Sequence, residues 1–353
     1  MPNDNPPSHS QARHARLRAP QVAIVGATGA VGIELIACLE QRGFPLAGLR
    51  LFASPRSAGK TLAFRGQDLP VEVMEAASLD GIDIALFSAG SGASKRFAPA
   101  AAAKGTIVVD NSSAFRMDPD VPLVVPEVNA AAIALHRGII ANPNCVAIIA
   151  AVPLAPLHAA NPIRRIIAST YQAASGAGAA AMAELRDATA AHLAGVKFEN
   201  KVLAHPYAFN LFSHDTDIDP VTGENGEEIK VGRELRKIMG VPDLRVGVTC
   251  VRVPVLRAHT IAMTIEFDQP IGVDAARELL AAAPGIRIVD DRARNHFPMP
   301  REATGQGDVL VGRLREDASD PSGRSLSMLV AGDQLLKGAA LNAVQIAERV
   351  MQG

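Results

Sequence analysis

The fold is decided near the start of the chain by residues 21–32, QVAIVGATGAVG. An apolar run, Gln21 to Val25, leads into a turn that contains three glycines. After the turn, Val31, Leu35 and Leu39 recur at helical spacing. This order of strand, tight turn and helix predicts the first unit of a parallel sheet with helices on both faces.

The three glycines have the GxxGxxG spacing of a dinucleotide-binding turn. A turn this tight requires residues without a Cβ atom. It also leaves N–H groups exposed at the helix N-terminus, where the helix dipole favours a phosphate. A glycine turn without a ligand is the alternative. The predicted cofactor contacts along the turn are Gly26, Thr28, Gly29, Ala30, Val31 and Gly32.

The segment after the second predicted strand, Leu49 to Ala53, indicates which nicotinamide the turn would take. Proteins that bind NAD place an acidic residue at the end of this strand, where it accepts from the ribose hydroxyls. This chain has no carboxylate there and continues with Arg56 and Ser57. A guanidinium and a hydroxyl suit a 2′-phosphate, so we predict NADP. The alternative is that Arg56 is an ordinary surface arginine.

Two different sheets are expected along the chain. Strands at Ile82–Ala89 and Thr106–Asp110, with an alanine-rich helix between them, extend a Rossmann-type doubly wound parallel sheet. Beyond residue 145, long β-branched runs such as Ile163–Ala173 and Leu244–Val255 predict an α+β domain with a mixed sheet. Helical patterns cover Ala179–Leu193, Gly226–Met239, Val273–Ala282 and Gln334–Val350.

These patterns predict two domains and a tail. We expect a disordered tail over residues 1–19 and an NADP-binding domain over 20–144, which the C-terminal helix 333–353 joins. A catalytic and dimerisation domain is expected over residues 145–332.

Composition excludes several classes of protein. The 353 residues are 48% hydrophobic, which is typical of a globular protein. With 35 basic and 36 acidic residues the net charge is −1, which argues against nucleic-acid binding. No apolar run has membrane-spanning length. The three cysteines lie far apart in the sequence, so we expect a reducing, cytoplasmic location without disulfides or a metal site.

The most informative residue is Cys145, at the end of the tetrapeptide NPNC, residues 142–145. The proline favours an extended backbone before it, Asn144 is a good N-cap, and Cys145 would begin the next helix. At that position the helix N–H groups lower the pKa of a thiol and can hold an oxyanion. Cys38 and Cys250 lie in apolar patterns and are expected in the core.

A thiolate nucleophile needs a partner for proton transfer, and nine histidines are available. His259 follows a long apolar run, but the residues alone rank it only modestly above His205 or His214. A lone histidine is more often structural than catalytic, so the partner of Cys145 stays open at this point.

A series of motifs in one order resembles the aspartate-semialdehyde dehydrogenases, from Pro20 to the C-terminus. The matching segments are Gly26–Gly32, Ser88–Gly90, Asp110–Arg116, Val125–Asn129, Asn142–Cys145, Tyr171–Gly178, Gly226–Lys230 and Arg252–His259. Several ordered motifs are far more specific than one glycine-rich turn. The resemblance implies reversible, NADPH-dependent reduction of aspartyl 4-phosphate to aspartate 4-semialdehyde and phosphate, in the biosynthesis of lysine, threonine, methionine and isoleucine.

The resemblance also implies a role for each matching residue. Cys145 would be the nucleophile that forms a thioester, His259 the acid/base and Gln172 an orienting group. Arg252 would bind the substrate carboxylate and Glu227 its ammonium. The family is usually dimeric and sometimes tetrameric, and we expect a homodimer. The remaining expected contacts are with phosphate, by Arg116, Lys230 and Asn111, and with the cofactor, by Ser175, Gly176 and Gln334.

Each of these residues has an ordinary structural alternative. Glu227 and Lys230, three apart on a predicted helix, could form an exposed ion pair. Arg116 could be a surface arginine, and Gln172 could be satisfied by backbone groups. Arg252 differs, because an arginine inside an apolar strand needs a partner.

Three other functions stay open. N-acetyl-glutamyl-phosphate reductase uses the same logic, but its substrate carries an acylated amine, for which a carboxylate such as Glu227 is not expected. Glyceraldehyde-3-phosphate dehydrogenase shares the cysteine and the histidine but not the surrounding motifs. A non-catalytic NADP-binding relative is disfavoured, because Cys145, Gln172, Arg252 and His259 are all present.

Overall fold

The computed structural model describes residues 18–75 and 78–352. Apart from Arg18 and Ala19, the expected tail therefore lies outside the described residues. The chain forms two compact units, each with its own sheet. The first unit contains the described residues up to Pro126, Ala130–Asn142 and the chain from Ala343 onward. The second unit contains Glu127–Asn129 and Pro143–Asn342.

The first unit is built on a seven-stranded sheet of order β3-β4-β2-β1-β5-β6-β7. All neighbouring strands are parallel except for the β3–β4 hairpin. The hairpin was not predicted, because its turn uses Arg65 and Gly66 (φ 50° and 76°) rather than a common Asn-Gly pair. The strands are β1 (Gln21–Val25), β2 (Gly48–Ala53), β3 (Thr61–Phe64), β4 (Gln67–Val73), β5 (Ile84–Phe87), β6 (Ile107–Asp110) and β7 (Ile139–Ala141).

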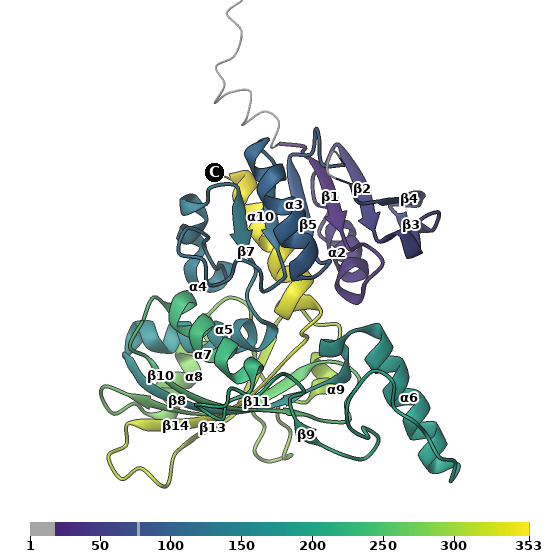
Figure 1. The fold of residues 1–353 in the computed structure, drawn as a ribbon. Helices are drawn as coiled ribbons and strands as arrows, with labels where there is room; N and C mark the ends of the chain where they lie inside the picture. Colours follow the sequence, from purple (N-terminus) through teal and green to yellow (C-terminus); the bar gives the residue numbers. More distant parts are fainter. Residues whose placement is uncertain (1–17, 76–77, 353) are drawn as a thin grey trace, which may run out of the picture. The chain divides into compact units, whose positions relative to one another are not determined.

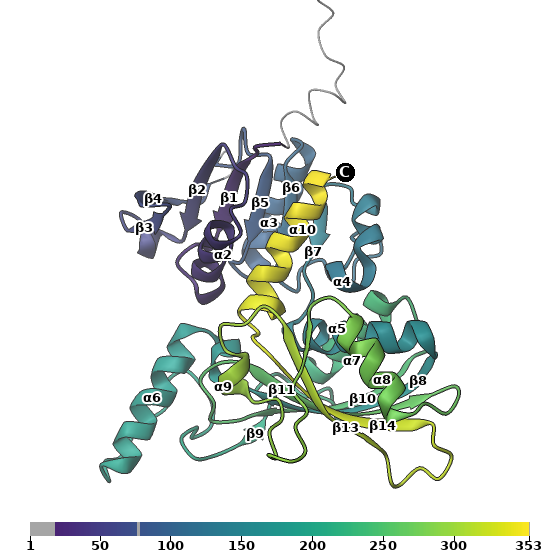
Figure 2. The ribbon, with the colours of Figure 1, turned by 180° about the vertical axis from the view of Figure 1, so that it is seen from behind.

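Helices cover both faces of this sheet, so the predicted doubly wound arrangement is confirmed. Helix α3 (Ser91–Ala103) lies on one face, and α2 (Ala30–Gln41) and α10 (Leu341–Gln352) lie on the other (Figures 1 and 2). Arg42, just after α2, donates two hydrogen bonds of 2.7 Å to Glu348 of α10. The shorter helical segments of this region are η1 (Pro55–Ser57), α4 (Pro126–Asn129) and η2 (Ala130–Leu135).

The second unit is built on a mixed seven-stranded sheet, as predicted, of order β12-β13-β14-β11-β8-β10-β9. The pairs β8–β10 and β12–β13 are parallel, and the other neighbours are antiparallel. The strands are β8 (Ile163–Gln172), β9 (Phe212–Ser213), β10 (Arg245–Arg252), β11 (His259–Phe267), β12 (Ile286–Ile288), β13 (Val309–Glu316) and β14 (Ser325–Gly332).

Three helices of the second unit cover one face of its sheet: α5 (Cys145–Ala160), α7 (Gly226–Met239) and α8 (Val273–Ala282) (Figure 1). Helix α5 is apolar all round, and Val146 to Leu154 are buried without a break. Such a helix belongs in the interior, where it can hold a residue at its N-terminus in a fixed position. The other helical segments are η3 (Ala174–Ala177), α6 (Ala179–Leu193) and α9 (Pro300–Ala303).

The C-terminal helix differs from its prediction. Before α10 the chain makes a wide turn, the π-helical segment η4 (Leu336–Ala340), in which Gly338 N–H donates to the Asp333 carbonyl five residues back. A Cβ atom on Gly338 would lie 2.9 Å from the Cβ of Cys145, so the wide turn places backbone directly against the cysteine. Lys337, fully buried in the same turn, pairs with Glu127 at 2.5 Å.

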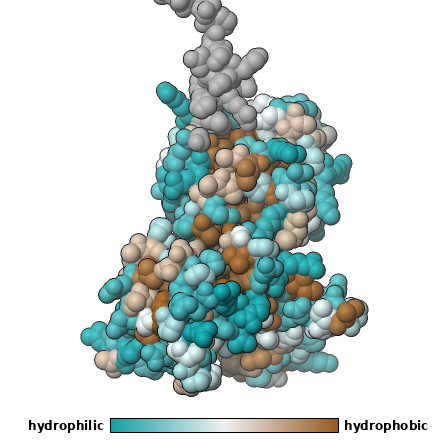
Figure 3. All heavy atoms as spheres, turned by 90° about the vertical axis from the view of Figure 1, so that its left-hand side faces the viewer, coloured by the Kyte–Doolittle hydropathy of each residue, from teal (hydrophilic) through white to brown (hydrophobic). Residues whose placement is uncertain are grey.

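No helix in the described part of the chain is long and apolar enough to cross a membrane. On the face drawn in Figure 3, hydrophilic residues predominate and hydrophobic residues form separate patches.

Candidate active site

The glycine-rich turn of the first unit has the close packing that its sequence requires. Gly26 has φ of +95°, and a Cβ atom there would lie 2.5 Å from the Ser88 carbonyl oxygen. A Cβ atom on Gly32 would collide with Gly26 and Ala27. Gly29, the N-cap of α2, has no side chain to accept from the first-turn N–H groups. Those groups can therefore serve a phosphate, so the turn fits a dinucleotide. It holds all six predicted turn contacts, Gly26, Thr28, Gly29, Ala30, Val31 and Gly32.

The second predicted cofactor segment lies beside the first. Arg56 and Ser57 form η1, directly after β2, and the Ser57 hydroxyl is 3.1 Å from that of Thr28 in the glycine turn. Arg56 is exposed, and it pairs with no acidic side chain within the described ranges. A cation and a hydroxyl beside the turn are groups that an added phosphate on the ribose would need.

The expected phosphate ligands Arg116 and Asn111 both follow β6 in the first unit. Arg116 is buried and donates to the carbonyl oxygens of Asn142 (3.0 Å) and Asn111 (2.8 Å), so it is not an ordinary surface arginine. The side chain of Asn142 donates to that of Asn111 at 3.0 Å. These bonds fix the backbone that leads toward Cys145. Lys230, the third expected ligand, belongs to the second unit.

Cys145 is the first residue of α5, where the sequence predicted it. Asn144 caps the helix: its side-chain oxygen accepts from the N–H groups of Val146 (2.9 Å) and Ala147 (3.3 Å). The Cys145 side chain is partly exposed, whereas Cys38 and Cys250 are buried, and all three cysteines are thiols. Burial raises the pKa of Cys250 to about 12, which leaves that thiol inert at neutral pH.

Glu227 is a buried carboxylate in contact with the helix cap. It accepts from the side-chain amides of Asn144 (2.8 Å) and Gln172 (3.2 Å), and Lys230 Nζ lies 3.6 Å from its second oxygen. Burial raises the pKa of Glu227, but the charge of His214 when that ring is protonated, the charge of Lys230 and these hydrogen bonds outweigh it, so that pKa is lowered and the group is an anion. Because Glu227 is buried, it is not part of an exposed surface pair.

Arg252 and His259 direct two buried donors at the same space. Ala173 N–H donates to Nδ1 of His259 at 3.0 Å, so the proton of the neutral ring is on Nε2. Asp215 accepts from Nε of Arg252 at 3.0 Å. Neither His259 Nε2 nor Arg252 Nη1 has a partner among the described residues. A Cβ atom on Gly176 would lie 3.2 Å from the first and 3.1 Å from the second, so the glycine leaves room where both donors point.

The environment of His259 keeps its ring neutral. The residue has no exposed surface, and burial, helped by the charge of Arg252, lowers the pKa of the imidazole to about 3. The two other histidines that the sequence offered as partners of Cys145 have different surroundings. His205 is exposed and packs against Phe212, while His214 is buried beside Asp215, with its pKa lowered chiefly by burial.

Sequence analysis missed the loop that supports these groups. Asp215 holds Arg252, and Thr216 accepts from the N–H group of Glu227 at 3.1 Å through its hydroxyl. The only signal is the polar run Ser213 to Asp217, which nothing in the sequence links to a strand more than thirty residues later.

Ser175 and Gln334 are held together inside the second unit. The Gln334 amide donates to the Ser175 hydroxyl and accepts from the N–H group of Ala258 at 2.9 Å. Ala258 has φ of 71°, a conformation that alanine rarely adopts, and it directly precedes His259. The side-chain bonds of Ser175 and Gln334 thus fix the approach to the histidine. Their contact with a cofactor stays a prediction.

The second unit therefore combines a thiol at a helix N-terminus with two buried donors that have no acceptor among the described residues. Such donors stabilise a carboxylate or an oxygen that gains negative charge, which is the requirement of acyl transfer. Within residues 18–75 and 78–352, no cluster of three or more His, Cys, Asp or Glu side chains could hold a metal ion.

Comparison with known proteins agrees with this geometry. A family model described as "Semialdehyde dehydrogenase, NAD binding domain" matches residues 21–136, and one described as "Semialdehyde dehydrogenase, dimerisation domain" matches residues 154–337. The aspartate-semialdehyde dehydrogenase of Synechocystis is 52% identical over 334 residues, covering 94% of this chain and 97% of that protein. The enzyme of Bacillus subtilis is 44% identical over 339 residues, covering 94% and 97%.

A solved structure is similar to the same extent. It is the crystal structure of aspartate semialdehyde dehydrogenase II from Vibrio cholerae complexed with ASA, which is 42% identical with a TM-score of 0.91 and covers 95% of this chain and 98% of that one. The resemblance stated from the motifs is confirmed, and aspartate-semialdehyde dehydrogenase is favoured over N-acetyl-glutamyl-phosphate reductase and over a non-catalytic NADP-binding relative. The chain therefore belongs to the aspartate-semialdehyde dehydrogenase family of nicotinamide-dependent oxidoreductases.

Proposed function

We propose that this chain catalyses the reversible, NADPH-dependent reduction of L-aspartyl 4-phosphate to L-aspartate 4-semialdehyde and phosphate. The observation that carries the proposal is the pair of buried donors, Arg252 Nη1 and His259 Nε2, beside Gly176. They lie in the same unit as the Cys145 thiol, which is at the N-terminus of the capped helix α5. The product would supply the synthesis of lysine, threonine, methionine and isoleucine, as in the family that the chain resembles.

The first unit is proposed as the NADP-binding domain. The glycine turn from Gly26 to Gly32 would hold the pyrophosphate, and Arg56 with Ser57 would hold the 2′-phosphate. Bound NADPH supplies the hydride that reduces the acyl carbon. The second unit is proposed as the catalytic and dimerisation domain.

The chain's own residues account for the covalent steps. The Cys145 thiolate attacks the acyl carbon, the carbon–oxygen bond to phosphate breaks, and phosphate leaves with the electron pair. The resulting thioester is on Sγ of Cys145. After reduction, the carbon–sulfur bond of the tetrahedral species breaks, which releases the aldehyde and restores the thiolate. His259 donates from Nε2 to the oxygen that carries the negative charge.

The two ends of the substrate are matched by opposite charges. Arg252, held by Asp215, would bind the α-carboxylate with its remaining N–H groups. Glu227, an anion at neutral pH, would attract the ammonium group. Gln172 would orient the thioester, because Thr170 and Glu227 hold its side chain from both ends. An N-acetylated substrate has no ammonium for Glu227, which favours the aspartyl compound. Phosphate would be bound by Arg116, Lys230 and Asn111.

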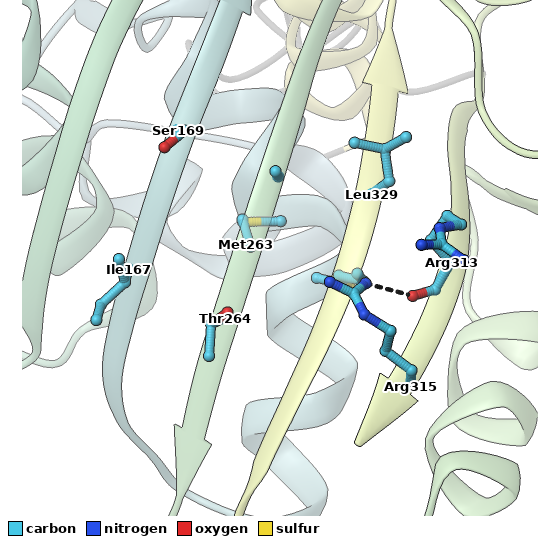
Figure 4. Close-up of a pocket in the computed structure, with 9 residues that line it drawn as sticks. Ile167, Ser169, Met263, Thr264, Arg313, Arg315 and Leu329 are labelled. Atoms are coloured by element: carbon cyan, nitrogen blue, oxygen red, sulfur yellow. Dashed lines mark hydrogen bonds between the residues drawn. The ribbon is translucent and has the colours of Figure 1, made fainter. Parts of the chain in front are cut away.

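A homodimer through the sheet of the second unit is also proposed. The face opposite α5, α7 and α8 carries no helix of the described chain (Figures 1 and 2). On it, Ile167 and Ser169 of β8, Thr264 of β11 and Leu329 of β14 line a shallow hollow of about 270 Å³ (Figure 4). Ile167 is 49% exposed, and a second copy would bury it. A monomer in sedimentation velocity at micromolar concentration would contradict this proposal.

Replacement of Cys145 by Ala is expected to abolish covalent catalysis. Turnover should fall by at least about 10⁴-fold, because no thioester can form. NADP affinity should stay within about threefold, since the glycine turn is untouched. Cys250→Ala is the control and should keep most of its activity. The assay follows NADPH absorbance with aspartate semialdehyde, N-acetyl-glutamate semialdehyde and glyceraldehyde 3-phosphate, each with and without phosphate. Near-normal turnover by Cys145→Ala would refute the assignment.

Acid should destabilise the fold through His259. Its pKa is about 3 when folded and about 6.5 when unfolded, so the unfolded chain takes up a proton that the folded chain does not between those values. Its contribution to stability is thus complete above about pH 6.5 and is lost as pH falls toward 3. His259→Asn should reduce the pH slope of the unfolding free energy there by about 1.4 kcal/mol per pH unit.

Urea titrations at several pH values between about 4.5 and 6.5 would measure that slope. His205→Asn, at an exposed histidine, is the matched control and should behave as the wild type does. Parallel slopes for His259→Asn and the wild type would rule out a neutral buried imidazole.

Arg56→Ala should weaken the preference for NADPH over NADH. Loss of a charge-assisted hydrogen bond to the 2′-phosphate should raise KM for NADPH by about 10- to 100-fold and leave KM for NADH nearly unchanged. Arg137→Ala, at an exposed arginine of the same unit, is the control. An equal effect of Arg56→Ala on both nicotinamides would mean that this arginine does not read the 2′-phosphate.

A further inference from the structure

Two buried carboxylates on one helix reach the residue before the nucleophile. Glu227 and Glu234 are seven residues apart on α7, which places them on one face, and they are 5% and 1% exposed. Glu234 accepts from the backbone N–H group of Asn144 at 2.5 Å. Glu227 accepts from the side-chain amide of the same Asn144 at 2.8 Å. Two side chains of α7 therefore hold Asn144, one through a hydrogen bond to its backbone and one through a hydrogen bond to its side chain.

Every polar group of Asn144 is engaged as a result. Its side-chain oxygen caps α5, and its backbone carbonyl accepts from Ile148 N–H at 2.9 Å. Because the N–H group and the carbonyl group of Asn144 are both hydrogen-bonded, the direction in which the backbone enters Cys145 is fixed. A thiolate that must attack along one line tolerates little displacement, and an error of about 1 Å can cost about 100-fold in rate.

The helix that carries Glu234 is itself firmly held. Asn225 and Glu228 form a reciprocal capping box at its start, and Gly240 ends it in the left-handed conformation. Glu228 also accepts from Cys250 N–H at 2.9 Å, which ties α7 to β10. Because α7 is held in place, the carboxylate of Glu234 has a fixed position relative to β10.

We propose that Glu234 is a positioning residue for Cys145, acting as a hydrogen-bond acceptor of the correct length for Asn144. The inference rests on the proposed function, because it assumes that Cys145 is the nucleophile. A negative charge on Glu234 would not be its contribution, because a second buried anion near α5 would oppose a thiolate rather than favour one. The length of its side chain is what matters.

Two substitutions separate length from charge. Glu234→Asp keeps the charge but withdraws the acceptor by one methylene, whereas Glu234→Gln keeps the length and an oxygen acceptor but removes the charge. Positioning predicts that Asp lowers kcat and the rate of Cys145 alkylation by iodoacetamide by about 10-fold or more, and that Gln stays within about threefold of wild type. KM for the semialdehyde should stay within about threefold in both variants.

Glu184→Asp is the matched control. Glu184 is a buried carboxylate of the same unit that accepts three backbone N–H groups, from Lys201, Val202 and Leu203. Its shortening should lower the melting temperature about as much as Glu234→Asp does, with alkylation and kcat unchanged. A Cys145→Ser variant gives the background alkylation of the two buried thiols.

The proposal is overturned if Glu234→Gln is impaired as much as, or more than, Glu234→Asp. It is equally overturned if Glu234→Asp only lowers the melting temperature, as the control does. Alkylation needs neither substrate nor nicotinamide. If every substrate in the panel fails but the alkylation rates follow the predicted order, the positioning role stands and the proposed reaction is what failed.

Discussion

The position of the Cys145 thiol depends on the side chain of Asn144. Its amide oxygen caps helix α5 and its amide nitrogen donates to Glu227 of α7, so both helices anchor the residue before Cys145. Loss of such a cap typically costs about 0.5–2 kcal/mol of stability. Its larger effect would be on geometry, because an attacking sulfur must be held in one direction. Gly338 also restricts the space beside Cys145, because a Cβ atom at residue 338 would lie 2.9 Å from the Cβ of the cysteine.

The opposite holds beside Gly176, where buried donors have no partner among the described residues. A buried donor that lacks an acceptor costs about 1–3 kcal/mol. The structure holds two of them, on Arg252 and His259, and keeps space open beside Gly176. Asp215 and Ala173 fix the side chains from behind. This cost is reasonable only if a ligand provides the missing acceptors, which a carboxylate and a developing oxyanion would do.

Local patterns predicted much of the fold. The helices Ala179–Leu193, Gly226–Met239 and Val273–Ala282 have the predicted bounds, because local sequence signals determine them: glycines precede the first and third, and a capping box begins the second. The two sheet types and the helix start at Cys145 were also predicted. The β3–β4 hairpin and the π turn at Leu336 were not, because an unusual turn pair and packing against Cys145 produce them.

The candidate site could be inferred from the sequence only where motifs carry it. Chemistry and family resemblance together point to Cys145 and His259. The supporting residues Asp215 and Glu234 gave no signal, because their partners, Arg252 and Asn144, are 37 and 90 positions away in the sequence. Nothing in a local pattern tells a buried acceptor from an ordinary surface acid on an amphipathic helix.

The most direct test of covalent catalysis is to trap the acyl group. The protein would be mixed with aspartyl 4-phosphate without any nicotinamide, quenched in acid, and mapped by mass spectrometry. The account predicts one aspartyl group, attached to the peptide that contains Cys145 and absent from Cys145→Ala. An adduct on another residue, or no adduct in a preparation that reduces the same substrate when NADPH is added, would contradict it.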